Sequence, residues 1–359
     1  MMKDRRSSAS LSICMVNYNG EKYLKESLDA VFSQRDKFEE VLLVDNASED
    51  KSLEIVRETF PAVKIIELRS NKGPATARNV GFRSASCDRI LFLDNDVKLT
   101  PECPGRLMQA LDAHPRAAVA MPRIVYDKNQ HIIQFDGADC HFLGLMMLHN
   151  VNRPLGGSSQ KTSKIGSLVT ACFLMDRKMW GKENPFDESF FFNYEDHDFG
   201  LRTRIMGHEI LSVAFACCYH QEGTKGLSFR EGRSYPELRI FFLIRNRWQI
   251  LLKNYELKTL CLLFPVFLIY ESFQLVGTIK KGWFIQWLKA FSFIFIHFTE
   301  IMKKRRIVQA KRITPDREIL KGGSIPFVPS LTQDSLERMG EKMLNRMVGI
   351  YWKQIQDWI

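Results

Sequence analysis

Two acidic clusters and one histidine are the residues best suited to chemistry in this chain. Asp94 and Asp96 flank Asn95 directly after the apolar run 90–93, which is typical of a strand. Carboxylates spaced in this way can supply oxygen ligands to Mg²⁺ or Mn²⁺ and leave coordination positions open for substrate phosphates. Surface turns also produce D-x-D often, so the position after a strand is what favours a metal site.

The second cluster is Glu195-Asp196-His197-Asp198, at the expected start of a helix. Carboxylates are favoured there by the helix dipole alone, which is the structural interpretation. The functional alternative is a general base, because a carboxylate beside a bound substrate can deprotonate an acceptor hydroxyl. His220 follows the strand expected at 212–220 and could complete a metal shell, although a lone histidine is more often structural.

Short apolar runs alternating with helix-like stretches would position these groups. The runs span 11–16, 41–44, 63–68 and 90–93, and the clearest helical stretches are 22–34 and 52–59. This alternation predicts βαβ units and a largely parallel sheet. Three of the runs stop at polar residues, namely Asn17, Asp45 and Asp94. Because ligands bind outside the carboxyl ends of strands in such sheets, we expect these three ends to converge on one site.

The segment 71–81 is expected to be a loop that opens a helix. Its small residues allow close backbone approach, and Lys72 and Arg78 could meet a phosphate group. It matches neither the P-loop nor the G-x-G-x-x-G pattern. The chain also has no G-x-S-x-G elbow, which argues against an α/β-type hydrolase.

Six segments in succession closely resemble family 2 glycosyltransferases of the GT-A fold. They read SICMVNYNGEKYLKESLDAV, VLLVDNASEDKS, NKGPATARNVGF, LFLDNDV, GSLVTACFLMDR and FNYEDHDFGLR. The resemblance covers about residues 10–250 and is strongest to the rhamnosyl- and galactofuranosyl-transferase-like branch. It implies an α/β fold with a Rossmann-like mixed sheet flanked by helices.

The resemblance also implies roles for individual residues. The nucleotide-sugar donor would be bound by Asn17, Asp45, Lys72, Arg78 and Asp94, with Asp45 on the base. Asp94 and Asp96 would hold Mg²⁺ or Mn²⁺ with the diphosphate, and His220 would join that metal shell. Asp196 would be the catalytic base of an inverting transfer, with Glu195 and Asp198 orienting the acceptor or the base.

The implied function is transfer of one or a few sugars to a hydroxyl of a lipid-linked or cell-surface glycan. Processive synthases carry Q-x-x-R-W, whereas here Ile244 takes the glutamine position before Arg247-Trp248, which favours a non-processive enzyme. Two alternatives stay open: a polyprenyl-phosphate sugar synthase, and a non-catalytic scaffold that binds nucleotide sugars.

The net positive charge of the chain comes entirely from its C-terminal part. Residues 1–220 hold 28 Lys and Arg against 29 Asp and Glu, whereas residues 221–359 hold 23 against 12. In that part the basic residues are interleaved with apolar segments, which favours an anionic membrane surface over nucleic acid as partner. We therefore expect a catalytic domain at 1–225, a helical extension at 226–256, a membrane-associated hairpin at 257–305, and a linker with an amphipathic helix at 306–359.

The hairpin comprises Leu257–Gly277 and Trp283–Met302, each close to the roughly 20 apolar residues that span a bilayer. If both spanned, the lysines of the turn would lie outside, against the positive-inside tendency. We therefore expect a peripheral or re-entrant hairpin on the cytoplasmic face of the cell membrane. Spanning helices and a buried helical pair are the alternatives, and the C-terminal helices are also a candidate surface for homo-oligomers.

The eight cysteines form no C-x-x-C pair, so we expect neither a zinc ribbon nor a disulfide framework, which fits a reducing compartment. The apolar run near the N-terminus is too short for a signal peptide, so we expect no secretion.

Overall fold

The structure is a computed structural model that describes residues 10–221, 237–327 and 334–359. Contacts divide the described chain into two compact units. The first contains residues 10–137, 149–199 and 208–221, and the second contains the rest, including 138–148 and 200–207. The expected domain boundary near residue 225 lies outside the described residues.

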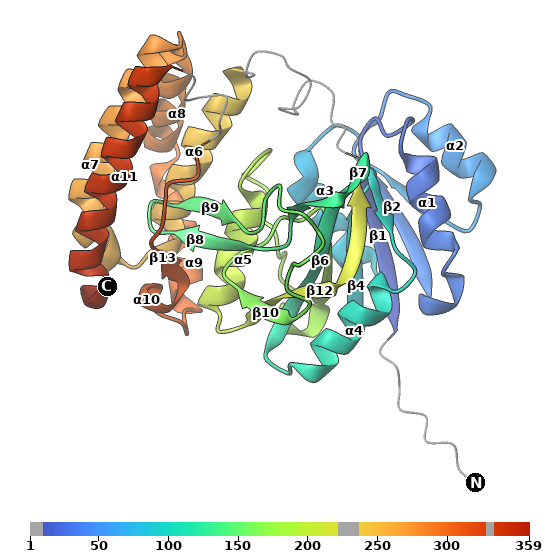
Figure 1. The fold of residues 1–359 in the computed structure, drawn as a ribbon. Coiled ribbons are helices and arrows are strands. Elements are labelled where there is room, and N and C mark those ends of the chain that lie inside the picture. Colours follow the sequence, from blue (N-terminus) through green and yellow to red (C-terminus); the bar gives the residue numbers. More distant parts are fainter. Residues whose placement is uncertain (1–9, 222–236, 328–333) are drawn as a thin grey trace. The chain divides into compact units, whose positions relative to one another are not determined.

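A mixed sheet forms the centre of the first unit (Figure 1). Its strands are β1 (Leu11–Asn17), β2 (Glu40–Asp45), β3 (Lys64–Glu67), β4 (Arg89–Asp94), β5 (Val97–Leu99), β6 (Ala117–Tyr126), β7 (Asn129–Phe135), β10 (Thr162–Ile165), β11 (Cys172–Asp176) and β12 (Glu209–His220). The order is β10-β12-β6-β11-β4-β1-β2-β3, with β5 paired to β12 and β7 paired to β6.

The parallel part of this sheet matches the prediction. β1 lies between β2 and β4 and pairs with both in parallel, and β3 continues the sheet beyond β2. The prediction of a largely parallel sheet is wrong for the other part, where β11 runs antiparallel to both β4 and β6. A short antiparallel strand needs no crossover helix, so helix–strand alternation in the sequence does not report it.

Helices cover the sheet of the first unit. They are α1 (Leu24–Phe32), α2 (Ser52–Thr59), α3 (Gly73–Ser84), α4 (Cys103–Ala113) and the first turn of α5 (Glu195–Ile205). α3 packs against β1 and β2, and α4 packs against β6 and β12. α3 starts at Gly73, whose φ is +80° and where an added Cβ would lie 2.2 Å from the carbonyl oxygen of Phe191. Only glycine fits that start.

The second unit is mostly helical, with a small sheet of β8 (Ala138–His141), β9 (Leu145–Leu148) and β13 (Leu320–Lys321). Its helices are α6 (Glu237–Asn254), α7 (Leu257–Lys280), α8 (Phe284–Ile296), α9 (Phe298–Ala310), α10 (Asp316–Ile319) and α11 (Ser335–Ile355). Phe142, in the β8–β9 turn, stacks on Trp352 of α11 with ring centroids 4.3 Å apart. The segment expected to be an irregular linker thus contains α10 and β13.

The second apolar segment is not one long helix. It divides at His297 into α8 and α9, and the His297 ring nitrogen Nδ1 lies 3.0 Å from the Phe293 carbonyl oxygen. Among the described residues, α7 alone is long and apolar enough to cross a membrane, and 17% of its apolar window is buried. α8 has 13 residues, too few for a bilayer core of about 30 Å at 1.5 Å per residue.

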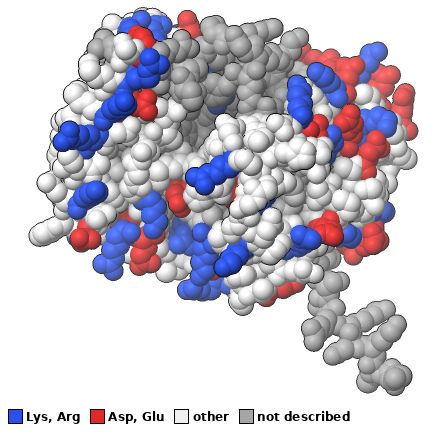
Figure 2. Space-filling view, in the orientation of Figure 1, with Lys and Arg blue, Asp and Glu red and all other residues white. Residues whose placement is uncertain are grey.

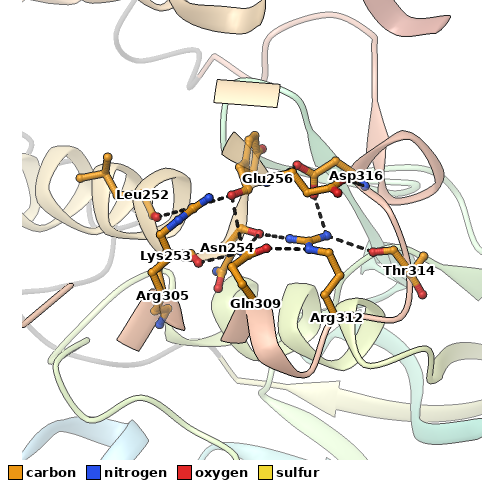
Figure 3. A network of polar contacts seen from close by, with 10 residues as sticks. Leu252, Lys253, Asn254, Glu256, Arg305, Gln309, Arg312, Thr314 and Asp316 are labelled. Atoms are coloured by element: carbon orange, nitrogen blue, oxygen red, sulfur yellow. Dashed lines mark hydrogen bonds and ion pairs between the residues drawn. The ribbon is translucent and has the colours of Figure 1, made fainter. Parts of the chain in front are cut away.

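The end of α6 is closed by side chains from α9 and the segment that follows it (Figure 3). Arg305 donates to the carbonyl oxygens of Leu252 and Tyr255 at 2.7 and 2.6 Å, and Gln309 donates to that of Asn254 at 3.0 Å. Arginine near a helix C-terminus satisfies carbonyls that have no partner within the helix. Nη1 of Arg305 is therefore engaged within the protein.

α11 presents apolar residues on two faces. Leu344, Val348 and Trp352 are buried, whereas Met343 and Ile350 are each 52% exposed. The stripe that contains Met343 and Ile350 is therefore exposed, and the neighbouring stripe packs on the protein. Figure 2 shows dense charges of both signs over α1 and α2, and sparser, mostly basic charges over α7 and α11.

Candidate active site

Asn17 joins three strand ends in the first unit. Its Nδ2 donates to Asp45 Oδ1 at 2.7 Å and to Ser52 Oγ at 2.9 Å, and its Oδ1 accepts from Asn95 Nδ2 at 2.7 Å. Asn17 and Asp45 are also register partners in β1 and β2. The convergence expected from the polar residues at the strand ends is present.

Asp45 lies at the carboxyl end of β2 and is 1% exposed. Its Oδ1 accepts from Ser48 Oγ at 2.6 Å, and its Oδ2 accepts from Ser48 N at 2.9 Å. A carboxylate oxygen can accept two hydrogen bonds, and Ser48 N supplies one to Oδ2.

Arg78 connects the two acidic clusters. It extends from α3, its side chain is 3% exposed, and its Nη2 donates to Asp94 Oδ1 at 2.7 Å. The same nitrogen donates to the Thr170 carbonyl oxygen at 3.1 Å, and Nη1 lies 3.6 Å from Glu195 Oε1. One buried guanidinium therefore holds the D-x-D carboxylate and the start of α5 together.

The neighbouring carboxyl groups at the start of α5 have different pKa values. Burial raises the pKa of Glu195 to about 8, and the negative charge of Asp196 adds to the shift. Burial raises the pKa of Asp196 to about 6, opposed by the hydrogen bond from His197 N at 2.7 Å. Burial thus raises the pKa of both carboxyl groups, and that of Glu195 more than that of Asp196. A carboxyl group with a pKa near 6 suits general-base catalysis.

His220, at the end of β12, forms a third group of polar contacts in the site, with Asp96 and Gln134. His220 Nε2 is 3.3 Å from Asp96 Oδ1, and His220 Nδ1 is 2.8 Å from Gln134 Oε1. Asp94 is joined to Arg78, and its side chain is 33% exposed. Burial raises the pKa of Asp94, while the charge of Arg78 opposes that shift.

The donor set of this group fits a divalent cation. Asp96 and His220 bring a carboxylate oxygen and an imidazole nitrogen to adjacent positions, and one-third exposure lets Asp94 turn an oxygen toward a ligand. Within the described residues, no three His, Cys, Asp or Glu side chains are already gathered closely enough to hold a metal ion. A third ligand from Asp94 therefore requires its side chain to turn.

Comparison with known proteins identifies this arrangement. The segment 12–180, which carries Asn17, Asp45, Arg78 and the D-x-D pair, matches the family described as Glycosyl transferase family 2. Residues 12–180, called here the family 2 domain, are similar to this family.

Curated relatives of the family 2 domain cover part of the chain. An uncharacterized glycosyltransferase of Haemophilus influenzae is 39% identical over 89 residues, which is 24% of this chain and 36% of the relative. The poly(ribitol-phosphate) beta-N-acetylglucosaminyltransferase TarS of Staphylococcus aureus is 32% identical over 109 residues, 29% of this chain and 19% of the relative. The match thus spans about a third or less of these relatives.

Solved structures extend the likeness beyond the family 2 domain. GalNAc-T7 crystallised with UDP, GalNAc and Mn²⁺ superposes with a TM-score of 0.56 at 16% identity, covering 71% of this chain and 49% of that chain. S. aureus TarS 1–349 superposes with a TM-score of 0.51 at 19% identity, covering 96% of this chain and 91% of that chain. The fold is GT-A.

Two predicted site residues, Lys72 and Asp198, are not among those described above as contacting Asn17, Arg78 or His220. Lys72 has an exposed side chain, while its backbone N–H donates to Asn46 Oδ1 at 2.9 Å. Asp198 is 0% exposed, and its charge raises the pKa of His197, although burial dominates and lowers that pKa to about 4. A fully buried Asp198 fits orientation of the base better than contact with an acceptor.

Several residues that contact the site, Asn95, Ser52 and Gln134 among them, were not predicted. Asn95 was read as the small residue between two carboxylates, yet it donates to Asn17. Ser52 was read as a helix start, and its hydroxyl accepts from the same side chain. Gln134 belongs to no motif, so no sequence signal could have found it.

Proposed function

We propose that this chain transfers a sugar from a nucleotide-diphosphate sugar to an acceptor hydroxyl with inversion at the anomeric carbon. The observation that carries the proposal is the bridge made by Arg78 between Asp94 and Glu195. It brings the carboxylate expected at the donor diphosphate close to the residue next to the expected base. Donor and acceptor chemistry would then share one site.

The donor would lie along the ends of β1, β2 and β4. Asn17 and Asp45 would line the nucleoside pocket, where Asp45 Oδ2 can accept a hydrogen bond from the base. Lys72, whose side chain is exposed, would approach a phosphate. Asp94, Asp96 and His220 would hold Mg²⁺ or Mn²⁺, and the bound cation would offset negative charge on the departing nucleoside diphosphate.

Asp196 would accept the proton of the attacking hydroxyl. The acceptor oxygen forms the new bond to the anomeric carbon as the bond to the diphosphate breaks, so a single displacement inverts the configuration. Burial raises the pKa of Glu195 beside it, so Glu195 would be suited to hold a proton and donate a hydrogen bond. Arg78 holds Glu195 and Asp94 in place during this step.

The acceptor we propose is a lipid-linked or cell-surface glycan, extended by one or a few sugars. A relative in Staphylococcus epidermidis, 23% identical over 174 residues, is named poly-beta-1,6-N-acetyl-D-glucosamine synthase, which supports a glycan acceptor. Ile244 in place of the glutamine of Q-x-x-R-W supports a non-processive reaction.

Removal of divalent cations is expected to abolish transfer. With a panel of UDP-, dTDP- and GDP-sugars, release of nucleoside diphosphate should occur with the correct donor and Mn²⁺ and should fall at least 100-fold in excess EDTA. Added Mn²⁺ should restore it, which controls for unfolding. Full activity in EDTA would contradict the metal ligands assigned here.

The second unit has apolar surface suited to a membrane. Phe295 and Ile296 at the end of α8 are 85% and 73% exposed, and Val276 and Ile279 of α7 are 67% and 58% exposed. Soluble proteins seldom expose so many large apolar side chains on two consecutive helices. We propose that α7 and α8 rest on the cytoplasmic face of the cell membrane, where basic residues near them meet anionic lipid.

Vesicle flotation tests this placement. The protein is expected to float with vesicles containing 30% anionic lipid, and the double variant Phe295→Glu, Ile296→Glu should bind at least tenfold more weakly, since each buried side chain contributes about 1.5–3 kcal/mol. Phe215→Glu, in the first unit and 48% exposed in the native protein, is the matched control. A wild-type protein that remains soluble without detergent and does not float would rule the placement out.

A further inference from the structure

Gln134 lies behind the histidine of the candidate metal site. It sits in β7, is 1% exposed, and places Oε1 2.8 Å from His220 Nδ1. With the amide oxygen facing the ring, this contact needs hydrogen on Nδ1. It therefore favours the Nδ1–H tautomer of the neutral imidazole.

The strands fix this contact. β12 and β7 both pair with the final residues of β6, where Tyr126 is the register partner of His220 and Val125 is that of Ile133. Gln134 itself lies at a bulge of β7, between Phe135 and Ile133, which pair with Ile124 and Val125 of β6. The flanking residues are held by the sheet, and a bulge can aim the side chain of its extra residue at a site.

The other ring nitrogen then faces Asp96. With hydrogen on Nδ1, neutral His220 has a lone pair on Nε2, and Nε2 lies 3.3 Å from Asp96 Oδ1. A lone pair and a carboxylate oxygen at this distance repel each other, and a divalent cation bound by both would remove that repulsion. Donors about 3 Å apart suit adjacent positions on one divalent cation.

We propose that Gln134 is a positioning residue that holds His220 as its Nδ1–H tautomer, so that Nε2 is presented together with Asp96 to a divalent cation. The proposal rests on the proposed function, because that function requires the cation. A residue that only satisfied a buried histidine could do so with either tautomer, whereas this role requires an acceptor at Nδ1. Replacing a residue that hydrogen-bonds a metal ligand typically lowers metal affinity 10–100-fold.

The first experiment needs no metal. ¹⁵N NMR of histidine-labelled, metal-free protein at pH 8 should show the Nδ1–H tautomer for His220, assigned by its loss in His220→Ala. In Gln134→Leu that signal should shift toward the Nε2–H tautomer, which histidine favours in water. In Gln134→Glu the signal of the Nδ1–H tautomer should remain, since a carboxylate also accepts a hydrogen bond from Nδ1–H. An unchanged tautomer in Gln134→Leu would overturn the proposal.

The second experiment measures Mn²⁺ binding by electron paramagnetic resonance in the presence of UDP. The Kd should rise 10–100-fold in Gln134→Leu and stay within about threefold of wild type in Gln134→Glu. Gln34→Leu is the matched control, because Gln34 is also buried and donates to the Ala30 and Thr100 carbonyl oxygens. Wild-type binding with an unchanged Kd in Gln134→Leu overturns the role of Gln134, whereas absence of wild-type binding overturns the metal dependence itself.

Discussion

Replacing Asp196 with asparagine is expected to lower kcat by about 10²–10⁴, because a positioned general base contributes that much to a proton transfer. The amide has nearly the same shape but cannot accept the hydroxyl proton. Donor affinity should be unchanged, since the ion pair between Arg78 and Asp94 does not involve Asp196. Steady-state rates and the Kd of the nucleoside diphosphate measure the two effects separately.

The pH profile identifies which carboxylate is the base. Asp196 acts only when ionised, and burial raises its pKa to about 6, so kcat should fall as the pH drops below about 6. A fall beginning near pH 8 would point to Glu195 instead, whose pKa is about 8. Asp29→Asn, which removes only an exposed ion pair with Lys25, is the matched control. Near-normal activity of Asp196→Asn would favour a phosphate acceptor, which needs no deprotonation.

Arg78→Met is expected to destabilise the first unit by roughly 3–5 kcal/mol, because removing one member of a buried ion pair leaves uncompensated charge. The methionine fills part of the space but leaves the carboxyl groups of Asp94 and Glu195 without the guanidinium. Urea denaturation followed by tryptophan fluorescence measures the loss. Activity should fall as well, since both acidic clusters lose their shared contact.

The loss of unfolding free energy in Arg78→Met should depend on pH. Without Arg78 the pKa values of Asp94 and Glu195 rise, so the folded variant binds more protons than the unfolded chain at intermediate pH. Its stability therefore falls as the pH rises, and the loss should be larger at pH 8 than at pH 5. Arg57→Met is the control, because its ion pair with Glu67 is exposed and should contribute at most about 1 kcal/mol. Equal losses in both variants would contradict the bridging role.

The parallel part of the sheet could be predicted because its strands are compact apolar runs. β1, β2 and β4 are buried along almost their whole length, so each appears in the sequence as a continuous run that ends in a polar residue. β10 could not be predicted in this way, since its residues are largely polar and half of them are exposed. Its pairing with β12 depends on residues about 50 positions away.

In the second unit, composition predicted the helices but not their ends or orientation. The break at His297 falls within an apolar run that has neither glycine nor proline, so no local signal marks it. Arg305 stands in a run of four basic residues that suggested a membrane surface, yet its side chain reaches the end of α6. Which partner a long basic side chain finds depends on tertiary structure.

The candidate site was predictable where motifs carry it. Asn17, Asp45, Asp94 and Asp96 stand at strand ends and were expected to gather, and Asn17 contacts Asp45 and Asn95 there. Arg78 was expected near the donor because it is a cation in a loop–helix segment. Its contacts with carboxylates could not be foreseen, since Glu195 is more than a hundred residues away.

The stacking of Phe142 on Trp352 has a consequence for synthesis on the ribosome. Trp352 emerges about 210 residues after Phe142, and at about 5–20 residues per second this is a delay of roughly 10–40 s. During that time the turn between β8 and β9 has no α11 to cover it. A nascent chain halted before α11 would expose this aromatic turn, which gives chaperones a defined interval in which to bind it.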